Sequence, residues 1–302
     1  MPKTVKVCVP GTTANCGPGF DAVGIACTIY NELELTLRDD SELTIEIIGE
    51  GQDVIPIDHQ NVVWQAIQHV LTKAGQSCQG AHIKMVNHVP LARGLGSSAA
   101  AIVAGLVAAN AAIGNPFSKQ QVFEMATEIE GHPDNVAPAL YGGITVSSVY
   151  QGKPQCLRFL PPATLNMVVA VPEFNLSTKA SRQVLPETVA YQDAVFNISR
   201  TALLIGALCQ GEFSHLQCAL EDRIHQPYRE QLIPGMRDVF KAANEMGAYG
   251  AAISGAGPCL IAFTQDNSEQ IGKAMVAAFK ENHIPAFYVI LNIDTEGAKV
   301  IG

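Results

Sequence analysis

The sequence has little positive charge. Of its 302 residues, 19 are lysine or arginine and 28 are aspartate or glutamate, so the formal net charge is −9. A protein that binds nucleic acid normally carries a basic face, and no basic segment occurs here. Nucleic acid is therefore not an expected partner. The excess of acidic residues favours solubility and excludes no fold.

Paired cysteines and zinc-binding spacings are also missing. The eight cysteines are scattered along the chain and none forms a C-x-x-C pair. This distribution indicates buried free thiols in a reducing compartment. The eight histidines include no H-E-x-x-H pattern, so no zinc site is predicted.

No apolar run is long enough to cross a bilayer. The most apolar stretch, Ala99 to Ala109, is interrupted by Gly105 and falls short of the roughly 20 residues that a spanning helix needs. Met1 to Thr4 leads directly into an alternating segment, and no apolar core of a signal peptide follows. We expect a cytoplasmic protein that does not interact with membranes.

The chain has ample material for a folded core. Hydrophobic residues make up 48% and charged residues 16% of the sequence, and the length suggests about two domains. Apolar periodicity predicts several elements in the first half. The expected strands are Val5–Pro10, Glu32–Leu37, Leu43–Ile48, His82–Val89 and Gly142–Tyr150, and the expected helices are Asn61–Ala74, Ser97–Ile113 and Ser118–Glu130. Gly11–Asp21, with three glycines and a proline, is predicted to be a loop.

A domain boundary is expected between Gln151 and Pro162, where turn residues cluster. We divide the chain into domains at residues 1–156 and 157–302. The second part should contain strand Leu165–Val171, helices to about Met246, strands Gly250–Ser254 and Cys259–Thr264, helix Ser268–Asn282 and strand Ala286–Asn292. This order predicts a ferredoxin-like domain with inserted helices, within an α+β protein.

A glycine- and serine-rich loop precedes the alanine-rich helix. Its residues are Pro90, Leu91, Ala92, Arg93, Gly94, Leu95, Gly96, Ser97, Ser98, Ala99 and Ala100. Glycine lets the backbone approach a ligand closely, and the amides and dipole of a helix N-terminus attract phosphate. The alternative is an ordinary helix with a serine N-cap. The loop lacks the G-K-[ST] of a Walker A motif, and the dinucleotide pattern G-x-G-x-x-G is incomplete.

Three further segments strengthen the phosphate-binding interpretation. Gly11–Asp21 and Ser254–Pro258 are rich in glycine, although the second could be a plain hairpin turn. Glu130–Asn135 contains two carboxylates, an imidazole and a carboxamide, and its Pro133 is predicted to fix a turn. Glu130 lies at the end of a predicted helix, where negative charge is disfavoured. A metal-binding role would explain it if phosphates lie nearby, and a solvated helix end is the alternative.

Together these segments resemble the GHMP kinases, the family named for galactokinase, homoserine kinase, mevalonate kinase and phosphomevalonate kinase. The resemblance rests on Val9–Asp21, Pro90–Ala101, Gly131–Ala139 and Ser254–Pro258, and it covers nearly the whole chain. Thr178–Arg182, Asp222-Arg223 and Pro227-Tyr228-Arg229 are similar to the members that phosphorylate homoserine. Gly11, Cys16 and Cys259 depart from the family's pattern without removing a group that the chemistry needs.

The resemblance implies a fold and a reaction. It implies an N-terminal ribosomal-protein-S5-like domain with a left-handed βαβ crossover, a C-terminal ferredoxin-like domain, and ATP bound between them with its phosphates on the loop. Ser98 and Glu130 would hold Mg²⁺. The implied reaction is the phosphorylation of L-homoserine to O-phospho-L-homoserine, a step of threonine biosynthesis. The family also suggests a homodimer.

Homoserine is a zwitterion with a primary hydroxyl, and the charges and amides of these segments offer a candidate for each of its groups. Arg182 and Arg223 would hold the carboxylate, because arginine matches it with a planar fork. Asp21 would hold the ammonium group, and Asn15 and Asn135 would bind the hydroxyl. The pocket would be completed by His132, Asp134, Thr178 and Gly257. Alternatives are that either arginine forms a surface ion pair, that His132 is structural, and that Thr178 caps a helix.

Asn135 has no useful basicity, so it can orient the hydroxyl without removing its proton. We therefore expect direct in-line transfer with late proton loss, as a loose transition state permits. One rival interpretation is a related kinase that acts on mevalonate or shikimate. Others are a nucleotide-binding sensor without turnover and a purely structural α/β protein.

Overall fold

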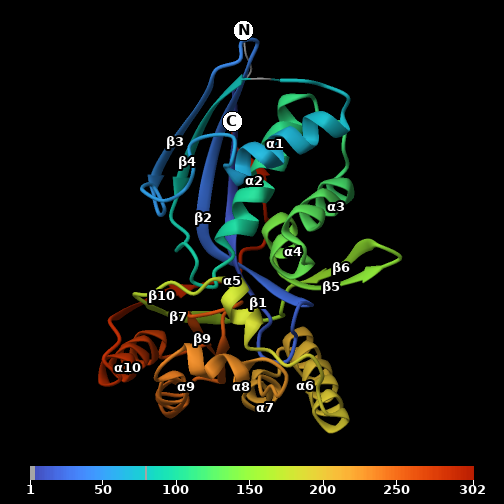
Figure 1. Ribbon diagram of the computed structural model, residues 1–302. Helices are drawn as coiled ribbons and strands as arrows, with labels where there is room; N and C mark the ends of the chain where they lie inside the picture. Colours follow the sequence, from blue (N-terminus) through green and yellow to red (C-terminus); the bar gives the residue numbers. More distant parts are fainter. Residues whose placement is uncertain (1–3, 79) are drawn as a thin grey trace.

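The computed structural model describes residues 4–78 and 80–302, so the lead-in at Met1 to Lys3 lies outside the described residues. A seven-stranded sheet forms the upper part of the molecule in Figure 1. Its strands are β1 (Thr4–Ala14), β2 (Val23–Arg38), β3 (Leu43–Gly49), β4 (Gly80–Asn87), β5 (Ile144–Tyr150), β6 (Lys153–Phe159) and β11 (Lys299–Val300). The order is β11-β1-β2-β4-β3, and β5 pairs with both β2 and β6.

Four helices pack beside this sheet (Figure 1): α1 (Val62–Lys73), α2 (Ser97–Ala112), α3 (Lys119–Glu130) and α4 (Pro133–Tyr141). β3 and β4 are parallel and are joined through α1, whereas the other neighbouring strands are antiparallel. Asn61 caps α1 by accepting the amide of Val63 at 2.8 Å, and Ser118 opens α3 with a capping box. These caps explain why both helices begin where the sequence predicts.

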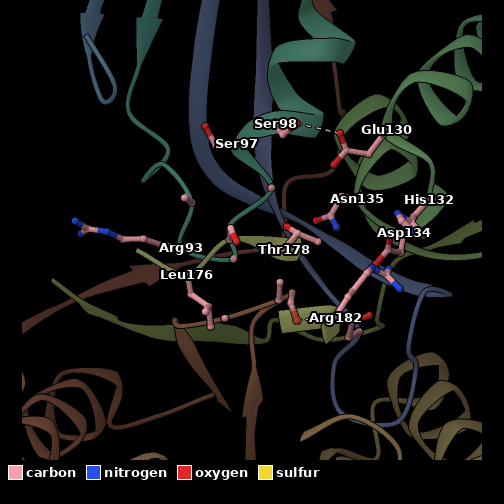
Figure 2. Close-up of a pocket in the computed structure, with 18 of the residues that line it drawn as sticks. Arg93, Ser97, Ser98, Glu130, His132, Asp134, Asn135, Leu176, Thr178 and Arg182 are labelled. Atoms are coloured by element: carbon pink, nitrogen blue, oxygen red, sulfur yellow. Dashed lines mark hydrogen bonds between the residues drawn. The ribbon is translucent and has the colours of Figure 1, made fainter. Parts of the chain in front are cut away.

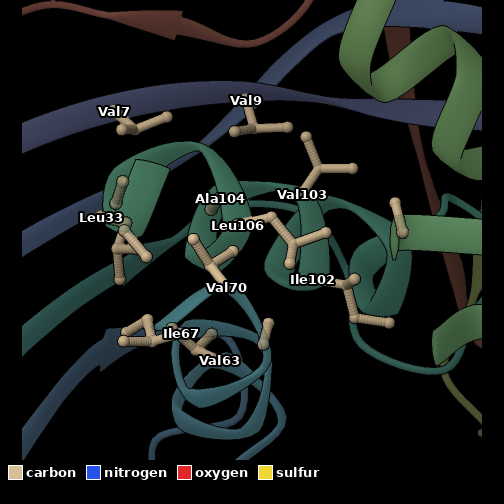
Figure 3. Close-up of a cluster of buried hydrophobic side chains, with 14 of the residues drawn as sticks. Val7, Val9, Leu33, Val63, Ile67, Val70, Ile102, Val103, Ala104 and Leu106 are labelled. Carbon is tan, nitrogen blue, oxygen red and sulfur yellow. The ribbon is translucent and has the colours of Figure 1, made fainter. Parts of the chain in front are cut away.

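The N-terminal core lies between the sheet and helices α1 and α2 (Figure 3). Val7 and Leu33 of the sheet, Ile67 of α1 and Ile102 of α2 are all buried. Burying each such side chain stabilises the folded state by roughly 1.5–3 kcal/mol. Gly105 lets the two helices approach, because a Cβ there would lie 2.8 Å from the carbonyl oxygen of Val63.

The second sheet confirms the ferredoxin-like prediction. Its strands are β7 (Asn166–Pro172), β8 (Gly250–Ile253), β9 (Leu260–Thr264) and β10 (Ala286–Leu291), in the antiparallel order β10-β7-β9-β8. The helices are α5 (Thr178–Gln183), α6 (Tyr191–Gln210), α7 (Leu216–Ala219), α8 (Gln226–Arg229), α9 (Met236–Glu245) and α10 (Ser268–Glu281), with 3-10 turns at Phe213–His215 and Glu230–Leu232. Five of these helices lie between β7 and β8. One of them, α9, packs against α10 and β8 as the first helix of the ferredoxin-like pattern, and the other four are the predicted insertion.

The predicted division after residue 156 falls inside β6, which pairs along its whole length with β5. The turn between β5 and β6 consists only of Gln151 and Gly152. Pro154 fits within β6 because β6 is an edge strand. The change of sheet comes between Phe159 and Asn166. β11 then returns to pair with β1, so residues 157–302 are not one continuous domain.

Two other predicted segments need correction. Gly11 to Ala14 continue β1 after a register shift, so the predicted loop begins only at Asn15. The segment after Gly131, predicted as a turn fixed by Pro133, is instead the start of α4, with His132 as N-cap and the proline in its first turn.

The structure bears on two features that the sequence analysis considered, membrane-spanning helices and the state of the cysteines. Across residues 4–78 and 80–302, no helix combines the length and hydrophobicity that crossing a bilayer requires. All eight cysteines are free. Cys16, Cys27 and Cys259 are buried as predicted, whereas Cys209 and Cys218 are exposed.

Candidate active site

A cleft of about 310 Å³ lies between the two sheets, and the glycine-rich loop forms one wall (Figure 2). Gly94 and Gly96 have φ angles of 85° and 68°, in the left-handed region that favours glycine. Gly96, and not a serine, is the N-cap of α2. Because glycine has no side chain to accept the first amides of the helix, these amides remain available to an anion. The geometry favours phosphate binding over an ordinary serine cap.

The C-terminal half holds this loop in place. Ser254 Oγ donates to the carbonyl oxygen of Gly94 at 2.6 Å. The amide of Cys259 donates to the carbonyl oxygen of Arg93 at 3.1 Å. On the other side, the amide of Thr12 donates to the carbonyl of Leu95 at 3.0 Å. The loop is therefore fixed by both halves of the molecule, and the Ser254–Pro258 hairpin has a structural role at the site.

The predicted loop residues divide into two groups. The cleft is lined by Leu91, Ala92, Arg93, Gly94, Gly96, Ser97 and Ser98. The others, Pro90, Leu95, Ala99 and Ala100, are buried in the protein behind it. They do not line the cleft, and they support the loop by packing.

Ser98 and Glu130 lie together at one end of the cleft (Figure 2). Ser98 Oγ donates to a carboxylate oxygen of Glu130 at 3.0 Å. Burial raises the pKa of Glu130, and the hydrogen bond from Ser98 partly offsets this. A hydroxyl and a carboxylate are oxygen ligands of the kind that Mg²⁺ prefers, with phosphates and water completing the shell. In the described part of the chain, no three His, Cys, Asp or Glu residues cluster as a metal site, so a metal here would depend on nucleotide phosphates.

Asn135 and Asn15 make different contacts. Asn135, on the first turn of α4, accepts a hydrogen bond from Thr12 Oγ1 at 2.8 Å through its Oδ1, so its Nδ2 is the group left to donate into the cleft. Asn15 Nδ2 donates to the carbonyl of Gly255 at 2.7 Å, and its Oδ1 accepts the amide of Asp21 at 3.0 Å. Asn15 therefore shapes the cleft wall and positions Asp21, with little capacity left for a substrate hydroxyl.

Two guanidinium groups and a carboxylate form the opposite end of the cleft. Arg182 pairs with Asp21 Oδ1 at 2.6 Å, and each side chain is 33% exposed. Arg229 is only 1% exposed and also lines the cleft. Both guanidinium groups lie over the ring of Phe20, at 5.3 and 5.2 Å from its centroid.

Arg229 was not among the residues predicted for the site. It donates to the carbonyl oxygens of Ser181 at 3.3 Å and Gly255 at 3.1 Å. It also donates to Nδ1 of His225, whose Nε2 donates to the carbonyl of Gly17 at 2.6 Å. His225 is therefore neutral, and burial lowers its pKa to about 4. Burial also lowers the pKa of Arg229, to about 10, so this arginine remains charged at neutral pH.

Arg223 does not reach the cleft, contrary to its predicted place in the pocket. It pairs with Asp193 at 3.3 Å and lies 3.9 Å from the ring centroid of Phe196, with 52% of its side chain exposed. The reason is the buried carboxylate of Asp222, which accepts the amides of Ile224, His225 and Gln226. These bonds turn Arg223 outward, and α8 carries Arg229 inward. Arg223 therefore forms an ion pair at the surface, which was the alternative to a role in substrate binding.

His132, Asp134, Thr178 and Gly257 all line the cleft, as predicted. Burial raises the pKa of Asp134 to about 7, and the nearby charge of Asp21 adds to this. Burial and Arg182 lower the pKa of His132. The cap of α5 is Ser177, whose Oγ accepts the amide of Ala180 at 3.1 Å, so the hydroxyl of Thr178 is not used as a cap.

The fold and this cleft define a two-domain phosphotransferase, and comparison with known families identifies it. The model of the GHMP kinases N terminal domain matches residues 61–143, and that of the GHMP kinases C terminal domain matches residues 204–281. The chain belongs to the GHMP kinase family.

Within this family, the chain is most informatively compared with homoserine kinases. It is 46% identical to the homoserine kinase of Carboxydothermus hydrogenoformans over 97% of this chain and 96% of that protein. It is 44% identical to that of Moorella thermoacetica, over 97% and 98%. The crystal structure of homoserine kinase from Cytophaga hutchinsonii superposes with a TM-score of 0.91 at 34% identity, covering 100% of this chain and 98% of that one. A mevalonate kinase from L. major shares the fold alone, with a TM-score of 0.73 at 19% identity.

Proposed function

We propose that this protein transfers the γ-phosphoryl group of ATP to the side-chain hydroxyl of L-homoserine, giving O-phospho-L-homoserine and ADP, a step of threonine biosynthesis. One observation carries the proposal: a single cleft joins the exposed N-terminus of α2, which suits a phosphate group, to a set of charges suited to an amino acid, namely Arg182, Arg229 and Asp21. The similarity to homoserine kinases over nearly the whole chain supports it. Because the reaction consumes ATP, we expect it to take place in the cytoplasm.

The loop between Ala92 and Ser98 would hold the ATP phosphates. Its left-handed glycines turn the backbone toward the cleft, and the first amides of α2 point to where the negative charge would lie. Phosphoryl transfer is accelerated mainly by positioning and by neutralising the charge of the transferred group. The rigid attachment of the loop to Ser254 and Thr12 serves that positioning.

Ser98 and Glu130 would hold Mg²⁺, which would neutralise part of the negative charge of the ATP phosphates. Their separation of 3.0 Å brings both oxygens to one point beside the helix N-terminus. The burial that raises the pKa of Glu130 is a cost in the free protein. A cation would favour the ionised carboxylate and remove that cost.

The charged end of the cleft would bind the two ionic groups of homoserine. Arg229 is fixed on one side by backbone carbonyls and lines the cleft with the rest of its guanidinium, which suits a carboxylate. Arg182 would share that carboxylate. Asp21 uses Oδ1 for Arg182, which leaves Oδ2 for the ammonium group.

Asn135 would orient the attacking hydroxyl. Since its Oδ1 accepts from Thr12, it would donate to the hydroxyl oxygen through Nδ2 and would not take the proton. In a loose transition state the proton can leave late, to a phosphoryl oxygen. Asp134, with a pKa of about 7 in the free protein, is the group that could act as a base instead.

Two other functions fit the cleft less well. Mevalonate and shikimate carry a carboxylate but no ammonium group, so they would leave Asp21 without its ligand. A nucleotide-binding sensor has no need of the Ser98–Glu130 pair, which is intact here.

The test compares homoserine with two analogues that each lack one ionic group. ADP release would be measured with homoserine, 4-hydroxybutyrate and 3-aminopropan-1-ol at several concentrations. We expect kcat/KM to fall by about a hundredfold or more for each analogue, because each lacks one of the two ionic groups that would bind the charged side chains of the cleft. Equal turnover of 4-hydroxybutyrate would refute the role of Asp21 and favour a kinase for simple hydroxy acids.

A further inference from the structure

Two guanidinium groups lie over one aromatic ring at the charged end of the cleft. Those of Arg182 and Arg229 lie 5.3 and 5.2 Å from the ring centroid of Phe20. The face of an aromatic ring is partly negative and attracts a cation that lies within about 6 Å of its centroid. Phe20 is therefore a contact that the two arginines share, although they carry charges of the same sign and come from different helices, α5 and α8.

The two arginines are held to different degrees. Arg229 is almost fully buried, and its Nε and Nη1 donate to two backbone carbonyls and to His225. Arg182, labelled in Figure 2, is one-third exposed, and its one hydrogen bond within the described chain runs from Nη2 to Asp21. The buried Nε of Arg182 has no partner among the described residues. Hydrogen bonds thus fix Arg229, whereas the position of Arg182 depends on Asp21 and on the ring of Phe20.

Phe20 is itself held in place by its surroundings. Its ring stacks on that of His225, with the centroids 5.0 Å apart and 28° between the ring planes. The amide of the next residue, Asp21, donates to Asn15 Oδ1 at 3.0 Å and fixes the backbone. Phe20 is half-buried and is not one of the residues that line the cleft. Any effect of its ring on a bound substrate would therefore act through the two arginines.

A similar arrangement occurs outside the cleft, around Phe196. The guanidinium groups of Arg200 and Arg223 lie 4.3 and 3.9 Å from the centroid of its ring. There each arginine also pairs with a carboxylate, Arg200 with Glu221 at 3.0 Å and Arg223 with Asp193 at 3.3 Å. Each positive charge over this ring is thus balanced within the protein.

Around Phe20, one such carboxylate is missing. Asp21 pairs with Arg182 at 2.6 Å, whereas Arg229 forms no ion pair with a carboxylate in the part of the chain that the structure describes. Burial, together with the charge of Arg182, lowers the pKa of Arg229, so a second anion would stabilise this pair of cations. An aromatic ring attracts a guanidinium group without accepting its N–H groups in ordinary hydrogen bonds, so these donors remain for a ligand.

We propose that Phe20 is a positioning residue for the carboxylate of the substrate. Its ring keeps the guanidinium group of Arg182 close to that of Arg229, so that a carboxylate meets both cations in a fixed arrangement. The attraction of the ring for both groups offsets part of their mutual repulsion. This inference rests on the proposed function, because it assigns the carboxylate to a bound amino acid.

The first test removes the ring. Phe20→Leu keeps an apolar side chain, and Phe20→Tyr keeps the aromatic face. With homoserine, Phe20→Leu should lower kcat/KM by about tenfold or more through a higher KM, and Phe20→Tyr should retain most of the activity. With 3-aminopropan-1-ol, which lacks the carboxylate, kcat/KM should be unchanged in both variants. Phe196→Leu is the matched control, since its ring also lies beside two arginines, and it should change none of these values.

Two results would overturn the role of Phe20. One is a fall of similar size with both substrates in Phe20→Leu, which would mean that Phe20 only supports the fold of the cleft. The other is an unchanged KM for homoserine in that variant. Both leave the proposed function intact, whereas a wild-type protein without turnover of homoserine would refute the proposed function itself.

The second test weakens the attraction of the ring and leaves the ring in place. Replacing Phe20 by mono-, di- and trifluorinated phenylalanine withdraws electron density from the ring face step by step, with little change in shape. KM for homoserine should rise with each added fluorine, while KM for ATP should stay constant. Thermal unfolding would confirm that each protein is folded. The same KM for homoserine across the series would overturn a role of Phe20 that acts through its attraction for the two arginines.

Discussion

The hydroxyl of Thr12 donates a hydrogen bond of 2.8 Å to Oδ1 of Asn135, joining β1 to the first turn of α4. Both residues also border the phosphate loop, since a Cβ on Gly96 would collide with Thr12 Oγ1 and lie 3.1 Å from Asn135 Oδ1. Thr12 is fully buried and does not line the cleft. It therefore fixes which end of the Asn135 amide faces a substrate.

Thr12→Val should lower kcat by about ten- to a hundredfold, because the Asn135 amide loses the bond that orients it. KM for ATP should not change. Valine is close in volume to threonine, which limits the loss of packing. Steady-state kinetics, with thermal unfolding to confirm the fold, would check this.

Thr12→Ser is the control for that variant. Serine keeps the donor and should retain most of the activity, which a purely steric role of the threonine methyl group would not allow. Wild-type kcat in Thr12→Val would show that Asn135 needs no orienting partner.

Glu130→Gln should lower kcat by about 10²- to 10³-fold, because glutamine keeps the shape but loses the charge that would hold Mg²⁺. Glu128→Gln is the matched control. Glu128 lies on the same helix but pairs with His69 and Lys73, away from the cleft. If Glu130→Gln had near-normal activity at limiting Mg²⁺, Glu130 would be only a helix-end residue.

Arg182→Ala should raise KM for homoserine by about ten- to a hundredfold and leave KM for ATP nearly unchanged, since a hydrogen bond to a charged group contributes about 1.5–3 kcal/mol. Arg223→Ala should change neither constant, because Arg223 pairs with Asp193 outside the cleft. A loss of ATP affinity in Arg182→Ala would instead make Arg182 a phosphate ligand.

Asp134 should make the free protein less stable as pH rises. Burial raises its pKa in the folded state to about 7, from an ordinary value of 3.8. The stability linked to its neutral form is fully present below about pH 4 and is lost as pH rises toward 7. Asp134→Asn removes this loss. Its free energy of unfolding relative to wild type should therefore increase by about 2–3 kcal/mol between pH 5 and pH 8.

Urea denaturation of both proteins at the two pH values measures that difference, and a constant difference would mean that Asp134 has an ordinary pKa. The kcat profile tests the same residue in catalysis. With saturating Mg-ATP and homoserine we expect no inflection between about pH 6 and 7.5. An inflection that vanishes in Asp134→Asn would identify Asp134 as a base and contradict transfer without one.

Much of the fold could be predicted because its signals are local. The capped helices α1 and α3, the alanine-rich α2 and the strands around Ser254–Pro258 follow from periodicity and turn residues. β6 was missed because its proline and neighbouring turn obscured a short edge strand. Helix α4 was missed because Pro133 suggests a turn as readily as the first residue of a helix.

The site was harder to predict where distant residues decide it. The loop, Ser98, Glu130 and Asn135 lie in recognisable segments. Arg223 and Arg229 are both arginines of one short segment, and only the buried carboxylate of Asp222 determines which one faces the cleft. Thr12 and Asn135 are 123 residues apart, so no local pattern indicates their hydrogen bond.

The most direct test of the proposed reaction is ADP release from Mg-ATP with a panel of homoserine, serine, threonine, mevalonate and shikimate. The account predicts the highest kcat/KM for homoserine, with the phosphate on its side-chain hydroxyl, because the cleft offers Arg182 and Arg229 to a carboxylate and Asp21 to an ammonium group. Faster turnover of mevalonate or shikimate than of homoserine would contradict it.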